Sequence, residues 1–157
     1  MELRDLSTAD EKLLKGWLKS YLAEHLTWWA AAYGRAPRYS PSDLADRDWT
    51  ELVSASRTAE HFVRVAESGQ PLGVVWAGLR SDRYMGITLG VLSWIYVAEE
   101  ARGQGVSSRL MAAAETWMRE RGVAGREVFV TAENRAAVRL YERFGYRAVD
   151  ARMLGPV

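Results

Sequence analysis

The segment EEARGQGVSSRLM, residues 99–111, places two glycines and two serines between an apolar strand and an apolar helix. The expected strand is the run ITLGVLSWIYV at residues 87–97, and the expected helix carries apolar side chains at helical spacing from Val106 to Met118. A glycine-rich turn at a helix start is typical of a phosphate site, because free backbone amides and the positive end of the helix dipole face it. The segment therefore predicts an α/β fold with an anion-binding turn.

Two common phosphate-binding motifs match this turn only in part. A P-loop requires a lysine directly after its last glycine, and no lysine follows Gly103 or Gly105. A dinucleotide fingerprint fits better, because Gly103, Gly105 and Ser108 occupy its three glycine positions. Glu133 even follows the next expected strand, where an acidic group would meet a ribose. However, residues 98–102 separate the strand from the first glycine, and too little chain follows Glu133 for a parallel dinucleotide-binding sheet. A nicotinamide-dependent oxidoreductase is therefore kept only as a remote alternative.

The order of expected elements predicts one mixed sheet flanked by helices. No linker, internal repeat or low-complexity tract interrupts the chain, so a single domain over residues 1–157 is expected. Strands are expected at 1–6, 60–68, 71–80, 87–97, 127–132 and 146–154, and helices at about 13–33, 43–56 (capped by Ser42 or Asp43), 105–121 and 134–145 (capped by Asn134 and stopped by Gly145).

The composition excludes several classes of function. Lys and Arg total 21 against 20 Asp and Glu, and this near balance argues against a nucleic-acid partner. The chain has no cysteine and only two histidines, which excludes disulfides and thiolate zinc sites and leaves no expected metal site. No window approaches the roughly 18 uninterrupted apolar residues of a membrane span, and the N-terminus is unlike a signal peptide. We therefore expect a cytoplasmic protein with no membrane partner.

Two matching segments carry a resemblance to a known family. The turn has the pattern Arg-x-x-Gly-x-small in RGQGVS, residues 102–107, and NRAAVRLYERFGY follows at residues 134–146. Both resemble the GNAT N-acetyltransferase superfamily, whose pyrophosphate loop reads Gln/Arg-x-x-Gly-x-Gly/Ala and whose later segment reads Asn-x-x-Ala-x-x-x-Tyr-x-x-x-Gly-Phe/Tyr. Ser107 departs from the loop pattern but is small enough to keep a phosphate close to the backbone. The resemblance implies a mixed, largely antiparallel central sheet flanked by helices, with splayed strands that form a CoA cleft.

The resemblance also implies roles for individual residues. Acetyl-CoA would be the co-substrate, and an amine would attack its thioester directly in a ternary complex. Tyr141 matches the tyrosine thought to protonate the departing thiolate, although an aromatic residue on an apolar helix face also fits a core position. The backbone N–H of Val97 would stabilise the oxyanion. The residues expected to bind CoA are Ile95, Tyr96, Val97, Arg102, Gly103, Gln104, Gly105, Val106, Ser107, Ser108, Asn134 and Tyr141.

The general base is not fixed by any motif. Glu133 and Tyr96 are retained as catalytic candidates beside Tyr141, and Asp82 and Glu24 are further acceptors for the ammonium proton. Glu99 and Glu100 adjoin the phosphate turn, where like charges repel, so both are interpreted as solvated. Because the base is open, a non-catalytic acyl-CoA-binding or regulatory module of the same fold remains the main alternative.

The acceptor is expected beside the aromatic end of the first long helix. Trp28, Trp29 and Tyr33 would line the acceptor site, since aromatic faces hold an ammonium or a flat apolar group. The competing interpretation is a buried helix face or a homodimer contact, where tryptophan and tyrosine are also enriched. Few acidic residues lie nearby, which favours a weakly charged small-molecule or peptide amine over a polycation.

Overall fold

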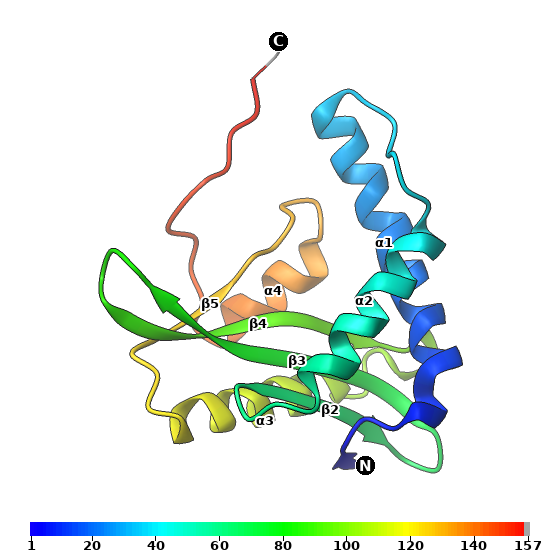
Figure 1. The fold of residues 1–157 in the computed structure, drawn as a ribbon, viewed down its shortest axis with the longest axis vertical. Helices are drawn as coiled ribbons and strands as arrows, with labels where there is room; N and C mark the ends of the chain where they lie inside the picture. The colour runs from blue at the N-terminus through cyan, green and yellow to red at the C-terminus, as the bar shows by residue number, and fades with distance from the viewer. Residues whose placement is uncertain (156–157) are drawn as a thin grey trace.

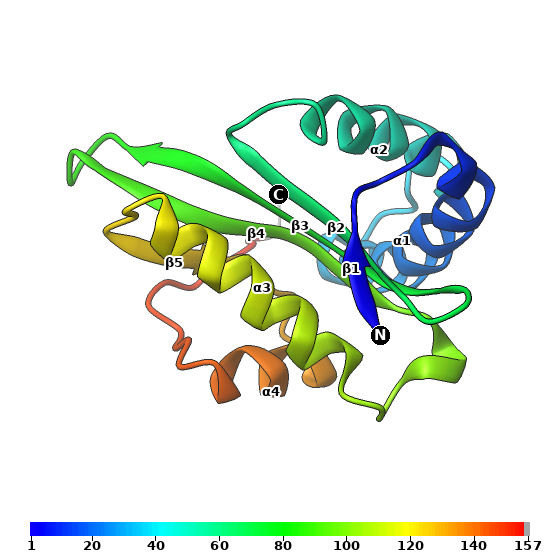
Figure 2. The same ribbon diagram turned by 90° about the horizontal axis from the view of Figure 1, so that it is seen from below.

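The computed structural model describes residues 1–155, which form a five-stranded sheet with helices on both faces (Figures 1 and 2). Helices α1 and α2 cover one face, and α3 and α4 cover the other (Figure 2). The helices are α1 (Glu11–Tyr33), α2 (Pro41–Ala55), α3 (Val106–Glu120) and α4 (Arg135–Arg143), with short 3-10 turns η1 (Thr8–Asp10) and η2 (Glu99–Ala101).

The sheet is mixed and largely antiparallel, as predicted. Its strands are β1 (Glu2–Arg4), β2 (His61–Glu67), β3 (Pro71–Asp82), β4 (Ile87–Val97) and β5 (Gly125–Val128). They lie in the order β1-β2-β3-β4-β5, and only the β4–β5 pair is parallel. The parallel pair follows from the crossover through α3, which returns the chain to the same end of the sheet.

Capping side chains mark where the chain turns into its first helices. Ser7 and Asp10 form a capping box at η1, which leads directly into α1. Ser40 and Asp43 form a second box before α2, with Pro41 at the first helical position. The predicted start of α2 at residue 43 was therefore wrong by two residues, because Ser40 rather than Ser42 or Asp43 is the cap.

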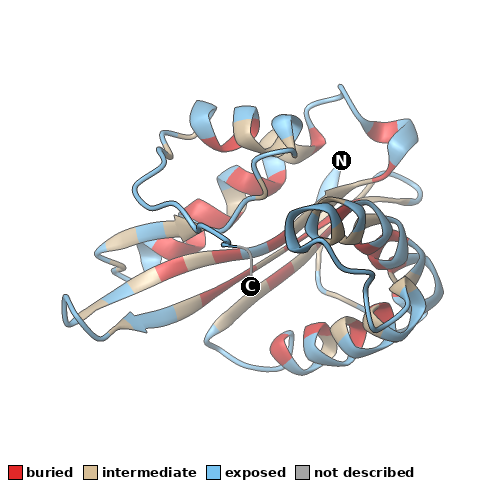
Figure 3. Cartoon of the chain, turned by 90° about the horizontal axis from the view of Figure 1, so that it is seen from above, coloured by how far each residue is buried: buried red, intermediate tan, exposed pale blue. Residues whose placement is uncertain are grey.

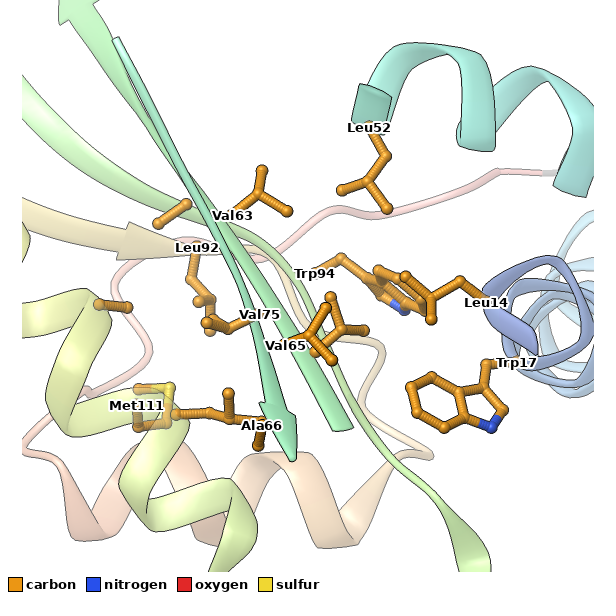
Figure 4. Packing of buried hydrophobic residues seen from close by; sticks show 14 of the residues in the cluster. Leu14, Trp17, Leu52, Val63, Val65, Ala66, Val75, Leu92, Trp94 and Met111 are labelled. Carbon is orange, nitrogen blue, oxygen red and sulfur yellow. The ribbon is translucent and has the colours of Figure 1, made fainter. Parts of the chain in front are cut away.

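The core has two layers, one on each side of the sheet. Figure 4 places Leu14, Trp17 and Trp94 on the side of α1, and Met111 with Ala66 on the side of α3. All five side chains are buried. Figure 3 shows the buried residues on the strands and on the helix faces turned toward them. The strand β4 thus lies between two packed layers.

Two strand predictions near the C-terminus were wrong. The strand expected at 127–132 is β5, which begins at Gly125 and ends at Val128. The closing strand expected at 146–154 does not form, and that segment is irregular. Val149 is 78% exposed and Met153 is 88% exposed, so the apolar positions of the segment bury little surface that would hold them in a sheet.

Candidate active site

The last residues of β4 have an open backbone edge. The strand β5 pairs with β4 only from Leu89 to Leu92, although β4 continues to Val97. Ser93 has no partner in β3, because the register shifts between Trp76 and Ala77, and this bulge lies just where the pairing of β4 with β5 ends. On the β5 side, the backbone of residues 93–97 therefore lacks a strand partner within the described chain. Ile95, Tyr96 and Val97, the predicted strand edge, all lie in this stretch.

The predicted phosphate turn follows at the same end of the sheet. Gly103 and Gly105 have φ angles of 76° and 78°, in the left-handed region that favours glycine. No side chain caps α3, and the first helical bond runs from the Arg109 amide to the Gly105 carbonyl at 3.1 Å. The amides of the first three helical residues, 106–108, consequently have no partner inside the helix. The turn thus presents free donors at the positive end of the α3 dipole.

The side chain of Arg102 lies back over the end of β4. Its Nε donates to the Val97 carbonyl at 3.3 Å, and its guanidinium carbon is 5.8 Å from the centre of the Tyr96 ring. Glu99 lies 3.9 Å from the same guanidinium. Glu99 and Glu100 are both exposed, as predicted. Arg102 therefore contributes a positive charge between the open strand edge and the amide-lined turn.

The helix α4 brings Tyr141 to the sheet. Asn134 is the N-cap, since its side-chain oxygen accepts from the Ala137 amide at 3.1 Å. Tyr141 is 8% exposed, and its ring centre lies 6.0 Å from that of Tyr146. Burial raises the pKa of the Tyr141 phenol, and the neighbouring phenols of Tyr21 and Tyr146 raise it further. Tyr141 therefore stays protonated at neutral pH, which is the form that can donate a proton.

The four candidate bases occupy different surroundings. Glu133 is exposed in the turn before α4, and Glu24 is exposed on α1. Tyr96 is half-buried and stacks on Trp17 with ring centres 5.5 Å apart. Asp82 accepts from the amides of residues 84 and 85 in the β3–β4 hairpin. That hairpin is at the opposite end of β4, about 30 Å from Val97 at roughly 3.3 Å per residue. Asp82 is therefore a turn residue and not a candidate base for this site.

Two residues near the site were not singled out as site candidates from the sequence. Tyr21 lies on the core face of α1, 6.3 Å from Trp94 and 3.9 Å from His25 between ring centres. Burial raises the pKa of Tyr21, and Asp48 on α2 raises it further. His25 is 3% exposed, and its Nδ1 lies 2.9 Å from the Tyr21 carbonyl oxygen. The proximity of Tyr21 to Tyr141 arises only in the folded chain.

The aromatic residues predicted for the acceptor line the far half of α1. His25 packs against Trp28 and Trp29, with ring centres 4.8 Å and 5.4 Å away. Trp29 is 38% exposed, and its indole N–H donates to the Thr131 hydroxyl at 3.2 Å. Tyr33 is exposed and accepts a hydrogen bond from Arg152. The far half of α1 therefore lies beside the β5–α4 connection, which leads directly into Asn134 (Figure 1).

Elsewhere in the described chain, fewer features suggest a binding or catalytic site. A surface hollow of about 530 Å³ lies between α3 and β2, lined by Phe62 and Trp117 among others, and it contains none of the predicted site residues. Residues 1–155 contain no group of three or more His, Cys, Asp or Glu side chains arranged to hold a metal ion. No helix within the same range is both long and apolar enough to cross a bilayer.

Comparison with known proteins identifies the family. The model of the acetyltransferase (GNAT) family matches residues 20–146, a range that contains the strand edge, the turn and α4. The chain belongs to the GNAT acetyltransferase family. An acetyltransferase from Agrobacterium fabrum is 31% identical over 127 residues, covering 74% of this chain and 87% of that protein. The predicted assignment to GNAT-type acyltransferases is thus confirmed.

Other matches extend the likeness. A mycothiol acetyltransferase from Renibacterium salmoninarum is 26% identical over 122 residues, covering 78% of this chain and 36% of that protein. This chain spans less than half the length of the mycothiol acetyltransferases that it matches. A solved structure of a mutant Bacillus halodurans protein has a TM-score of 0.80 at 17% identity, and it covers 100% of this chain and 99% of that chain. At that identity the likeness is one of fold.

Proposed function

We propose that residues 1–157 act as one N-acetyltransferase domain that moves an acetyl group from acetyl-CoA to a primary amine. The observation that carries this proposal is a convergence at the carboxyl end of β4. An unpaired strand edge and an amide-lined turn lie at this end, and the buried, protonated Tyr141 neighbours Tyr21, whose ring centre is 6.3 Å from that of Trp94 on β4. Each of these three features suits a different part of an acyl-CoA.

The turn suits the pyrophosphate of CoA. A Cβ added at Gly103 or Gly105 would meet no other atom within 4 Å, so the space over the turn is open to a ligand. Gly103, Gln104, Gly105, Val106, Ser107 and Ser108 would supply the backbone donors. Arg102 adds a positive charge beside them. The free edge at Ile95, Tyr96 and Val97 would pair with the amide groups of the pantetheine arm, as an added strand would.

Different residues would carry out the separate steps of a direct acetyl transfer. As the amine nitrogen bonds to the thioester carbon, the Val97 N–H would donate to the carbonyl oxygen, on which negative charge develops. When the carbon–sulfur bond breaks, Tyr141 would give its proton to the departing sulfur. A base takes the proton of the attacking amine, and Glu133 and Tyr96 are the candidates that lie on this side of the molecule. Asn134 would orient the CoA arm from the start of α4.

The acceptor would approach along the aromatic half of α1. Trp28, Trp29 and Tyr33 provide apolar and π-rich surface, with Glu24 as the only acidic residue in the helical turns around them. Such a wall favours a small-molecule or peptide amine of low charge. The relatives named for mycothiol also support a small-molecule acceptor. The exposed parts of Trp29 and Tyr33 are equally compatible with a homodimer contact.

A panel of amines separates this proposal from a non-catalytic acyl-CoA-binding module. The protein is incubated with acetyl-CoA and each amine, and free thiol and acetylated product are measured together. We expect at least one weakly charged amine to give both products in equal amounts. Binding of CoA in calorimetry without transfer to any amine would favour the binding module. Binding of NAD without binding of CoA would contradict both.

A further inference from the structure

Arg126 on β5 contacts both α3 and the chain just after α4, the helix that carries Tyr141. Arg126 pairs with Glu115 of α3, whose side chain is 9% exposed. The same guanidinium donates to the Phe144 carbonyl at 3.4 Å, and its carbon lies 4.9 Å from the centre of the Tyr146 ring. A single planar fork thus contacts α3 and the chain just after α4, and these two helices lie on the same face of the sheet (Figure 2).

The segment that Arg126 contacts is the end of the helix that carries Tyr141. The Tyr146 amide donates to the Tyr141 carbonyl at 3.1 Å, and the Gly145 amide donates to the Glu142 carbonyl at 3.0 Å. Gly145 has a φ of 81°, so the helix ends in a Schellman motif in which Tyr141 and Tyr146 are the two residues joined across the turn. The tilted contact between their rings completes this motif.

We propose that Arg126, held by Glu115, is a positioning residue that fixes the Tyr141 phenol for proton transfer. This inference rests on the proposed function, in which Tyr141 is the proton donor. Arg126 holds the last carbonyl of the turn and the face of the Tyr146 ring, and Tyr146 in turn packs against Tyr141. Loss of these Arg126 contacts would let the Tyr141 ring shift, and small displacements of a catalytic group lower reaction rates steeply.

An arginine at residue 126 can pair with the buried carboxylate of Glu115 and still make its two contacts at the end of α4. A lysine at residue 126 would keep the charge pair with Glu115 but would present one ammonium, which cannot also reach the Phe144 carbonyl and cover the Tyr146 ring. Arg126→Lys therefore removes the positioning contacts without leaving a buried charge unpaired. The matched control is Arg80→Lys, because Arg80 on β3 pairs with Glu127, the residue next to Arg126 on β5. Adjacent strand residues point to opposite faces, so this second pair lies away from α3 and α4.

The test is a double-mutant cycle with Tyr141→Phe. We expect Arg126→Lys to lower kcat roughly 10-fold in the native background, part of the 10²–10⁴-fold that a general acid supplies. In the Tyr141→Phe background the same change should alter kcat by less than twofold, since no proton donor is left to position. The Kd for CoA should stay constant, and Arg80→Lys should change neither quantity.

The possible results separate this inference from the proposed function. An equal loss of kcat from Arg126→Lys in both backgrounds, or no loss in either, would overturn the positioning role while leaving Tyr141 as the donor. A normal kcat in Tyr141→Phe alone would overturn the donor role itself. Should Arg126→Lys unfold, the double change Glu115→Gln with Arg126→Gln removes both charges of the pair, and the same cycle applies to it.

Discussion

The left-handed glycine at the start of α3 gives a quantitative test of the phosphate turn. Gly105 has a φ of 78° and is exposed, and no atom lies within 4 Å of the Cβ that alanine would add. Alanine in this region costs roughly 1–2 kcal/mol. We expect the free protein with Gly105→Ala to relax out of the left-handed conformation, so that the amides of residues 106–108 no longer converge.

Binding of CoA would then have to restore the strained conformation. A cost of roughly 1–2 kcal/mol corresponds to a Kd about 5- to 30-fold higher, since 1.4 kcal/mol is a tenfold change. The matched control is Gly69→Ala in the β2–β3 turn, because Gly69 has a φ of 73° and equally open space around its Cβ. Calorimetry with CoA and urea denaturation are run on both variants.

We expect the two alanine variants to differ in CoA affinity alone. Both should be no more stable than the native chain, and only Gly105→Ala should bind CoA more weakly. An unchanged Kd in Gly105→Ala, or an equal rise in Kd for Gly69→Ala, would contradict the assignment of this turn to the pyrophosphate.

Three further predictions concern the packing and the acceptor side. Gly73→Ala should lower the free energy of unfolding by about 1–3 kcal/mol, because its Cβ would lie 2.7 Å from the Tyr96 carbonyl oxygen. Gly16→Ala at an exposed position of α1 should instead stabilise the fold, and equal effects of the two changes in urea denaturation would refute this. Burial lowers the pKa of His25, so below about pH 6.5 the unfolded chain binds more protons than the folded chain, and the free energy of unfolding falls with acidification. His25→Gln should make the free energy of unfolding depend less on pH, and an unchanged dependence between pH 5 and 7 would show that another group causes it. Trp29→Phe removes the hydrogen bond to Thr131 and should raise the KM for the amine roughly 2- to 10-fold, while the KM for acetyl-CoA stays unchanged. A raised KM for acetyl-CoA with an unchanged KM for the amine would show that this part of α1 does not line the acceptor site.

Local signals predicted most of the fold because the deciding residues are close together in the sequence. The apolar stripe of α3, the glycines of the turn and the Asn134 cap each act within a few residues, and all three features are present in the structure. Within the run at 146–154, residues 149–153 alternate apolar and polar side chains as a strand would, yet Val149 and Met153 find no covering surface and the strand does not form. Alternation predicts a strand only where a neighbouring strand and a buried face exist.

The candidate site was predictable only in part for the same reason. The turn and Tyr141 lie in recognisable segments, so their expected neighbourhood followed from the order of the elements. The open edge of β4 begins at the bulge at Ser93, and the contacts of Arg126 join α3, β5 and the end of α4. No spacing within one segment carries either feature, because each is created by elements that meet only in the folded chain.

Replacement of Tyr141 by phenylalanine tests the central claim most directly. The change removes the hydroxyl of a buried side chain and keeps the ring that packs against Tyr146, and Tyr84→Phe in the exposed β3–β4 hairpin serves as its control. With the best amine of the panel, we predict that Tyr141→Phe lowers kcat by about 10²-fold or more while the Kd for CoA changes less than twofold. A kcat equal to that of Tyr84→Phe would contradict the account, because Tyr141 would then be only a core residue.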